Sequence, residues 1–161
     1  MGKSKEVKTN VMRILDQMKI GYKAYTYECE EFVDAVQIAD MLGLSYEKVY
    51  KTLVTVGSKG EHFVFVIPIR EELDLKKAAK AVGEKALSMI PVKELLKVTG
   101  YVRGGCTAIG MKKTYVTRID KRAESLEWMI VSGGRIGSQM ELAPQDLCRA
   151  CGGAFADVIV G

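Results

Sequence analysis

The sequence of 161 residues is poor in the residue types on which metal and redox proteins depend. It contains four cysteines, one histidine and one tryptophan. No stretch approaches the roughly 20 apolar residues that a membrane span requires, and the first ten residues, MGKSKEVKTN, lack the apolar core of a secretory signal. These absences predict a cytoplasmic protein without a membrane segment, in which disulfides are not expected.

The cysteines give little support to a metal site. Cys148 and Cys151 form a CRAC pair, which is half of a zinc-binding or redox pattern. A complete zinc site would need Cys29, Cys106 or the single histidine, His62, and none of these offers a second paired spacing. We therefore favour ordinary buried thiols over zinc or redox chemistry, and we expect neither a metal nor a cofactor.

Composition and length indicate one globular domain, residues 1–161, with 48% hydrophobic and 27% charged residues. The formal net charge of +4 hides an uneven distribution, because residues 24–47 hold six acidic and no basic side chains. Residues 48–161 hold 18 basic and 12 acidic side chains. Such a basic body is compatible with a polyanionic partner and also with solvated lysine faces.

Hydrophobic spacing and turn residues predict alternating helices and strands. Helices are expected at 5–18 with its end at Gly21, at 34–42, as one turn after Ser45, at 75–82, from Pro91 to Gly100, as a turn or short helix at 120–126, and from Pro144. Strands are expected at 22–27, 49–56, 62–67, 115–119, 128–131, 136–142 and 155–160. Several links are too short for a crossover helix, which predicts an α/β fold with a mixed, largely antiparallel, curled sheet.

Lys51 is the most informative single residue, because it lies in the middle of the strand-like segment VYKTLVTV. Alternation places its side chain on the face of Val49, Leu53 and Thr55. Such a lysine either extends into water at a sheet edge or is held in a cleft, where its ammonium attracts an anion or polarises an ester carbonyl. Both readings remain open on pattern alone.

Two glycine pairs are further candidates. The segment SGGRIGSQ, residues 132–139, follows a buried strand, and the amides of Gly133 and Gly134 with the Ser132 hydroxyl suit an oxyanion or ribose. The segment matches neither GxGxxG nor the P-loop, and a simple sheet corner is the stronger alternative.

The segment RGGCTAIGMKK, residues 103–113, poses a similar choice. A nucleophilic Cys106 would need an adjacent base, whereas His62 belongs to a strand that is expected to be buried. We favour a substrate loop in which Gly104 and Gly105 leave room for a ligand and Thr107 offers a hydroxyl. Lys112 and Lys113 would then attract phosphate.

Three separated segments, taken together, resemble the YbaK-type Cys-tRNA(Pro) deacylases. They are VYKTLV (49–54), GYVRGGCTAIGMKK (100–113) and IVSGGRIGSQMELAPQDL (130–147), and LDLKKAAKAVG (73–83) matches as well. The likeness covers nearly the whole chain. It implies a sheet curled into a partial barrel with helices around it, no metal, and the removal of cysteine wrongly attached to proline tRNA, in concert with prolyl-tRNA synthetase.

The resemblance implies that Lys51 is essential and that the cysteinyl sulfur of the substrate attacks its own ester. This mechanism suits a chain without a credible protein nucleophile, because the protein need only position the ester and stabilise charge. Tyr27, Thr52 and Ser132 are implied to line the site, and Phe32 is added to them. The tRNA-binding residues are expected to be Arg103, Lys112, Lys113 and Arg135.

The chain departs from the family pattern at several positions. Cys106, Thr107 and Ala108 stand where an aliphatic residue, serine and proline are usual, and Ile136 and Gln139 replace a common basic residue and a common aspartate. Two alternatives therefore stay open. One is a deacylase for another small amino acid, such as alanine on tRNA(Pro), which would use water. The other is a catalytically silent module that binds tRNA or the synthetase.

Overall fold

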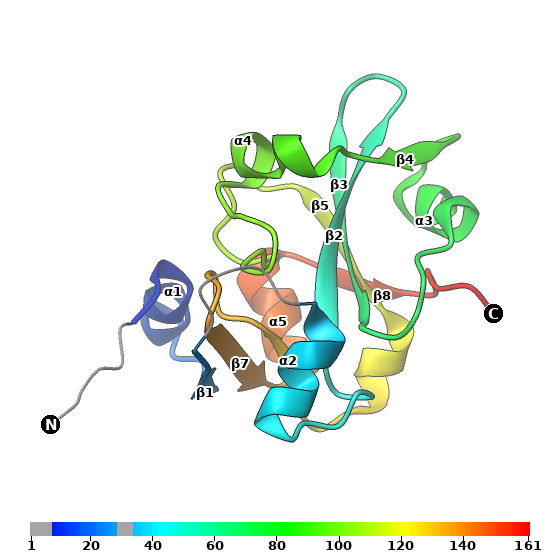
Figure 1. The fold of residues 1–161 in the computed structure, drawn as a ribbon. Helices are drawn as coiled ribbons and strands as arrows, with labels where there is room; N and C mark the ends of the chain where they lie inside the picture. The colour runs from blue at the N-terminus through cyan, green and yellow to red at the C-terminus, as the bar shows by residue number, and fades with distance from the viewer. Residues whose placement is uncertain (1–7, 29–33) are drawn as a thin grey trace, which may run out of the picture.

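The computed structural model describes residues 8–28 and 34–161, which form helices and strands in alternation (Figure 1). The α-helices are α1 (Asn10–Gln17), α2 (Ala35–Leu42), α3 (Leu75–Val82), α4 (Leu95–Thr99) and α5 (Pro144–Cys151), with 3₁₀ turns η1 (Val92–Glu94) and η2 (Lys121–Ser125). The strands are β1 (Lys23–Thr26), β2 (Tyr50–Gly57), β3 (His62–Pro68), β4 (Leu87–Met89), β5 (Val116–Asp120), β6 (Met129–Ser132), β7 (Ser138–Leu142) and β8 (Ala154–Ala156).

The strands form two sheets that meet at the start of β2. The larger has the order β4-β2-β3-β5-β8 and the smaller β1-β7-β6. Only the β3–β5 and β5–β8 pairs are parallel, and the other pairs are antiparallel. An isolated parallel bridge between Val49 and Ile130 connects the sheets. The predicted α/β fold with a mixed, largely antiparallel sheet is therefore confirmed.

Local capping explains where the helices begin and end. Asp34 and Gln37 form a reciprocal capping box at the start of α2, and Gly43 ends this helix with φ of 67°. The other predicted helices agree, but α1 differs at its end, because the chain turns at Lys19, whose φ is 61°, before it reaches Gly21. Residues 5–7 of the predicted first helix lie outside the described residues, and α1 begins at Asn10, after the Thr9 side chain that caps it.

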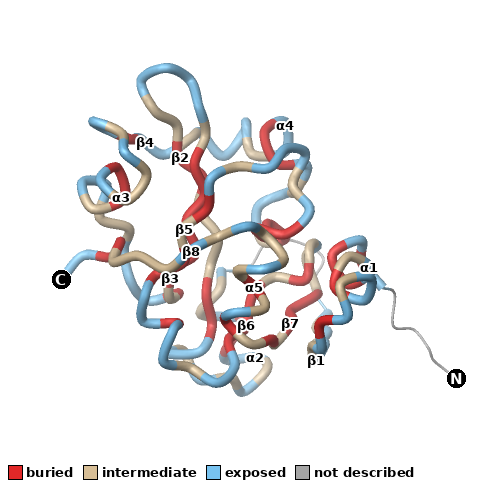
Figure 2. The backbone as a smooth tube through the Cα atoms, turned by 180° about the vertical axis from the view of Figure 1, so that it is seen from behind, coloured by how far each residue is buried: buried red, intermediate tan, exposed pale blue. Residues whose placement is uncertain are grey.

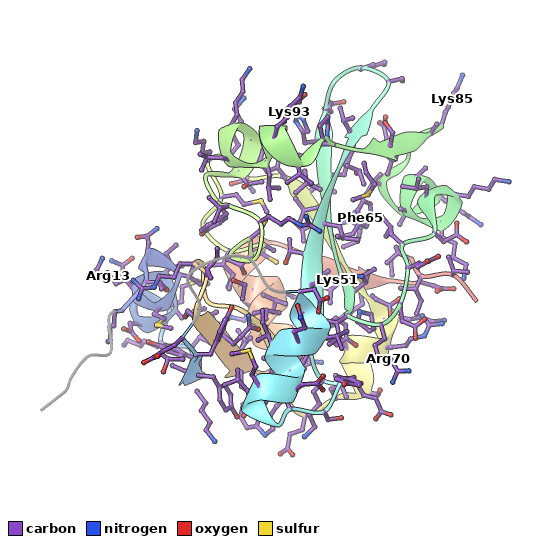
Figure 3. All side chains as sticks on the ribbon, viewed as in Figure 1. Arg13, Lys51, Phe65, Arg70, Lys85 and Lys93 are labelled. Carbon is purple, nitrogen blue, oxygen red and sulfur yellow. The ribbon has the colours of Figure 1, made fainter. Side chains whose placement is uncertain are left out.

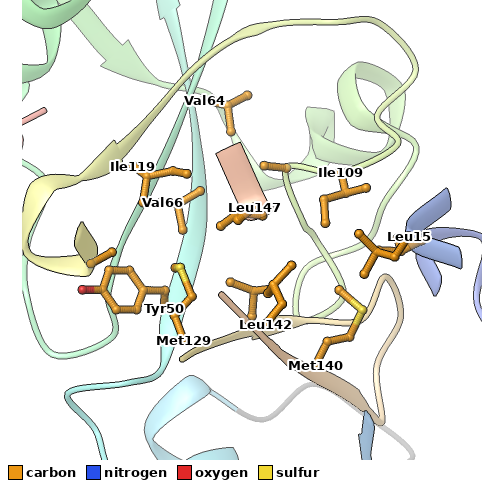
Figure 4. Packing of buried hydrophobic residues seen from close by; sticks show 14 of the residues in the cluster. Leu15, Tyr50, Val64, Val66, Ile109, Ile119, Met129, Met140, Leu142 and Leu147 are labelled. Carbon is orange, nitrogen blue, oxygen red and sulfur yellow. The ribbon is translucent and has the colours of Figure 1, made fainter. Parts of the chain in front are cut away.

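Strand β3 forms the centre of the core and is covered on both faces (Figure 2). Val64 and Val66 pack into a large cluster with residues of α1, β7 and α5, such as Leu15 (Figure 4). Phe63, Phe65 and Ile67 face a second cluster beneath α3. The alternation of side chains along a strand produces this division, and the predicted burial of both faces is confirmed.

Two local features differ from the predictions, whereas the turn expected after Ser45 is present and is closed by the Lys48 amide. The short edge strand β4 was not predicted. The last strand, expected at 155–160, covers only Ala154–Ala156, and the residues after it form a single antiparallel bridge between Ile159 and Leu73.

Within residues 8–28 and 34–161, no helix combines the length and apolar character that a membrane crossing requires.

Candidate functional site

A cavity of about 450 Å³ opens beside β2, where the two sheets meet. Its walls come from the start of α2, the first half of β2, the loop at 103–106 and the β6–β7 hairpin. The lining residues are Asp34, Ala35, Val36, Ile38, Val49, Tyr50, Lys51, Thr52, Leu53, Ile69, Arg103, Gly104, Cys106, Ser132 and Gln139. Segments far apart in the sequence therefore converge on the predicted lysine strand.

The cavity lies against a stretch of β2 that has no strand on one side. On this side the carbonyl of Val54 accepts from the Ile90 amide, and the carbonyl of Lys48 accepts from the Ile130 amide. The backbone groups of alternate residues point to the same edge of a strand, so the N–H and C=O of Thr52 point there too. No described strand pairs with them, which makes the Thr52 amide a hydrogen-bond donor available to a ligand.

Lys51 of β2 lines this cavity and is half-buried (Figure 3). Burial lowers the pKa of its ammonium below the ordinary value of 10.5, while the nearby carboxylates of Glu72 and Glu71 act in the opposite direction. In the part of the chain that the structure describes, its amine has no hydrogen-bond or ion-pair partner. Of the two readings left open by the sequence, the structure supports the lysine held in a cleft.

Four other predicted site residues join Lys51 at the cavity: Thr52, Gly104, Ser132 and Arg103. Gly104 has φ of 88°, a conformation that side chains disfavour, so glycine is suited to this wall. The Ser132 hydroxyl accepts a hydrogen bond from the Gly134 amide at 3.2 Å. That bond leaves the hydroxyl hydrogen of Ser132 available to a ligand.

The other glycines of the two pairs are absent from the cavity lining, and they bring chain segments together. A Cβ on Gly105 would lie 2.7 Å from the Cα of Arg135, and one on Gly133 would lie 2.1 Å from the Ser138 hydroxyl. A Cβ on Gly134 would lie 2.7 Å from Val11 of α1. Gly105, Gly133 and Gly134 therefore pack closely against neighbouring segments, and their contact with a substrate stays a prediction.

The remaining predicted residues that the structure describes are not among those that line the cavity. Within residues 8–28 and 34–161, the buried hydroxyls of Tyr27 and Thr107 have no hydrogen-bond partner, and Thr107 is 1% exposed. Lys112, Lys113 and Arg135 are exposed. Phe32 lies outside the described residues.

Comparison with known proteins identifies the family. The family model of the aminoacyl-tRNA editing domain matches residues 29–150. The chain belongs to this family. An Enterococcus faecalis protein, EbsC, named as a candidate Cys-tRNA(Pro)/Cys-tRNA(Cys) deacylase, is 44% identical over 157 residues, which is 97% of this chain and 96% of that protein. The uncharacterised YwhH of Bacillus subtilis is 26% identical over 69% of this chain and 70% of its own.

Solved structures show the same fold. The crystal structure of a candidate trans-editing enzyme for prolyl-tRNA synthetase matches with a TM-score of 0.80 at 24% identity, covering 95% of this chain and 99% of that one. The hypothetical protein APE2540 matches with a TM-score of 0.83 at 22% identity, covering 93% and 99%. The resemblance to YbaK-type proteins is confirmed, and so is the prediction of an aminoacyl-tRNA editing enzyme at the level of the family.

Cys106 is the only described cysteine at the cavity of this editing domain, and it is buried. Burial raises the pKa of its thiol to about 12, although a hydrogen bond with Thr99 acts in the opposite direction. The thiol therefore stays protonated at neutral pH and is a poor nucleophile. His62 does not line the cavity and packs its ring edge against Tyr115, with the ring centroids 5.9 Å apart.

The two thiols of the CRAC pair are partly buried, which raises their pKa values. Burial raises the pKa of Cys148, and it raises that of Cys151 to about 12. Among residues 8–28 and 34–161, no group of three or more His, Cys, Asp or Glu side chains could hold a metal ion. Cys29 lies outside the described residues.

Sequence reasoning missed the wall formed by α2 and did not assign Gln139 to the site. Asp34, Val36 and Ile38 line the cavity from the first turns of α2, and nothing in their local pattern shows which strand this helix covers. Gln139 of β7 is 5% exposed and also lines the cavity, with no hydrogen bond to its amide among the described residues. Its place after the SGG turn was the available signal, which marked it only as a departure from the family pattern.

Proposed function

We propose that this editing domain removes cysteine from mischarged Cys-tRNA(Pro). The observation that carries the proposal is the ammonium of Lys51, which has no partner among the described residues and lies in a cavity whose described walls hold no histidine and only a protonated cysteine. A site of this kind can stabilise negative charge but cannot supply a strong nucleophile. A substrate that carries its own thiol removes that requirement. The name of the 44% identical relative supports the same substrate.

In the proposed reaction the ester carbonyl oxygen lies between the Lys51 ammonium and the Thr52 backbone amide. The substrate sulfur forms a bond to the carbonyl carbon, the ester C–O bond breaks, and the thiol proton passes to the departing ribose oxygen. The products are free tRNA and a cyclic thioester of cysteine, which water then opens. The two donors act on charge that develops in the transition state, where such contacts accelerate the reaction most.

The need for this activity follows from size. Cysteine and proline have similar volumes, and a difference of about one methylene contributes only roughly 1–3 kcal/mol of discrimination in a binding pocket. Chemistry that requires a thiol separates the two, because proline lacks one. We further propose that the partners are tRNA(Pro) and prolyl-tRNA synthetase, and that the reaction takes place in the cytoplasm.

The decisive test compares Cys-tRNA(Pro), Ala-tRNA(Pro) and Ser-tRNA(Pro) with the wild type and Lys51→Ala. We expect loss of the cysteinyl ester only, and a decrease of about 10²–10³ in kcat for Lys51→Ala, the usual effect of removing one oxyanion donor. S-methylcysteinyl-tRNA(Pro) is the matched substrate control and should persist. Equal hydrolysis of the alanyl ester would favour a water-dependent deacylase, and no hydrolysis of any ester would favour a silent binding module.

A further inference from the structure

We infer that the acceptor end of the tRNA leaves the cavity over one basic strip, formed by Lys93, Lys97, Lys112 and Lys113. This inference rests on the proposed function and adds the side of the cavity over which the tRNA backbone leaves the site. A bound aminoacyl ester fixes only the terminal nucleotide, and the remaining phosphates must cross one side of the cavity mouth. The charges on the two sides decide which side they cross.

The two sides of the cavity carry opposite charge. Residues 91–113 supply the wall at 103–106 and hold five basic and one acidic side chains. Residues 34–47 supply the α2 wall and hold three acidic and no basic side chains. A polyanion is attracted by the first segment and repelled by the second. The tRNA backbone therefore lies over α4 and the loop that follows it.

Three lysines of the strip are brought together by the end of α4, and Lys113 follows the third of them in the sequence. Lys93 and Lys97 are four residues apart along η1 and α4, a spacing that places side chains on one helical face. Gly100 ends α4 with φ of 87°, and a Cβ there would lie 3.3 Å from the Cγ of Lys112. The Lys112 amide also donates to the Thr99 carbonyl at 3.1 Å. Lys112 is thus held against the end of the helix that carries Lys97.

All four lysines are exposed, and none has an ion-pair partner in the described part of the chain. Figure 3 shows Lys93 at the α4 end of the molecule and Lys51 nearer its middle. Arg103, which lines the cavity, belongs to the loop between α4 and the two later lysines. Arg103 therefore places a cation at the cavity, on the same chain segment as the lysines of the strip.

A protein partner is the other occupant to consider, because Val92 and Leu96 on the same segment are 58% and 54% exposed. Nucleic acid is favoured because the strip continues from the wall of the cavity that receives the tRNA end. Lysines bind phosphate as point charges, and each phosphate contact releases counterions, so such binding weakens steeply as salt rises. The dependence on salt separates the two occupants.

The test measures binding of uncharged tRNA(Pro) to Lys93→Gln/Lys97→Gln between about 50 and 200 mM KCl. The matched control is Lys76→Gln/Lys80→Gln, which removes two exposed lysines at the same spacing from α3, a helix that does not line the cavity. We expect the strip variant to raise Kd roughly tenfold at low salt and to lower the slope of log K against log salt by about two. The control should leave both values near those of the wild type.

Equal changes in Kd and salt slope in the two variants, or no change in either, would overturn the inference that the strip binds tRNA. Unchanged tRNA binding with lost stimulation by prolyl-tRNA synthetase would also overturn it and would assign the surface to a protein. Binding of uncharged tRNA does not depend on ester hydrolysis, so failure of the proposed chemistry would leave this measurement intact. Conversely, kcat on saturating Cys-tRNA(Pro) should be retained in the strip variant, because its lysines do not touch the ester.

Discussion

The backbone of Gly105 lies directly against that of Arg135, so that a Cβ at position 105 would come within 2.7 Å of the Cα and 2.9 Å of the carbonyl carbon of residue 135. Real Cβ atoms do not approach a backbone so closely, and a backbone cannot rotate away as a side chain can. This contact joins the loop at 103–106 to the β6–β7 hairpin. Both segments supply cavity walls, so the contact fixes the distance between Gly104 and Ser132.

The first prediction concerns Gly105→Ala. The added methyl group should force the two loops apart, lower the free energy of unfolding by about 1–3 kcal/mol, and reduce deacylation at temperatures where the protein stays folded. Urea denaturation and steady-state kinetics measure the two effects. Gly21→Ala is the matched control, because a Cβ there meets nothing within 4 Å. A stable and fully active Gly105→Ala variant would show that the loops move independently.

The second prediction concerns Cys106. Its thiol lines the cavity but is held protonated, with a pKa of about 12, and the proposed chemistry uses the substrate thiol. Cys106→Ala should therefore retain wild-type kcat on Cys-tRNA(Pro) within a few-fold. Loss of activity as large as that of Lys51→Ala, together with unchanged folding, would instead identify Cys106 as a protein nucleophile.

The third prediction concerns the carboxylate of Asp120, which is completely buried. It accepts hydrogen bonds from the Arg122 guanidinium at 3.0 Å, the Arg122 amide at 3.2 Å and the Val158 amide at 3.4 Å. Asp120→Ala should lower the free energy of unfolding by about 1–3 kcal/mol, because these donors lose a buried acceptor.

The control for Asp120 is Asp157→Ala. Asp157 contacts Lys77 and Arg122 but is 38% exposed in its side chain, and exposed ion pairs stabilise little. Urea denaturation should therefore show the smaller loss for Asp157→Ala. An equal or larger loss there would mean that the surface ion pairs, rather than the buried acceptor, hold the end of the chain.

Local structure was predictable from the sequence wherever a residue determines the conformation of its own segment. Asp34 caps α2, which begins where the pattern placed a helix, and the alternation around Lys51 placed this residue on a strand face. Packing between segments was not predictable. A glycine that lines a cavity and one that packs against a neighbouring backbone have the same local pattern, so the sequence could not show that Gly104 does the first and Gly105 the second. The α2 wall depends in the same way on tertiary contacts alone.

The last prediction concerns the pH dependence of deacylation. An ordinary thiol has a pKa of about 8.5, so ionisation of the substrate sulfur should make the rate rise through mildly alkaline pH. Burial lowers the pKa of Lys51 below 10.5, so the ammonium needed at the ester is lost as pH rises through that lowered value. The rate should therefore pass through a maximum and fall before pH 10.5.

Lys51→Arg distinguishes the two limbs of this profile. A guanidinium remains protonated throughout the range, so the variant should keep the rise and lose the fall, although its different shape reduces the absolute rate. The measurement is kcat on Cys-tRNA(Pro), corrected for spontaneous ester hydrolysis at each pH. A fall that persists unchanged in Lys51→Arg would assign the alkaline limb to another group and remove Lys51 as the cation of the reaction.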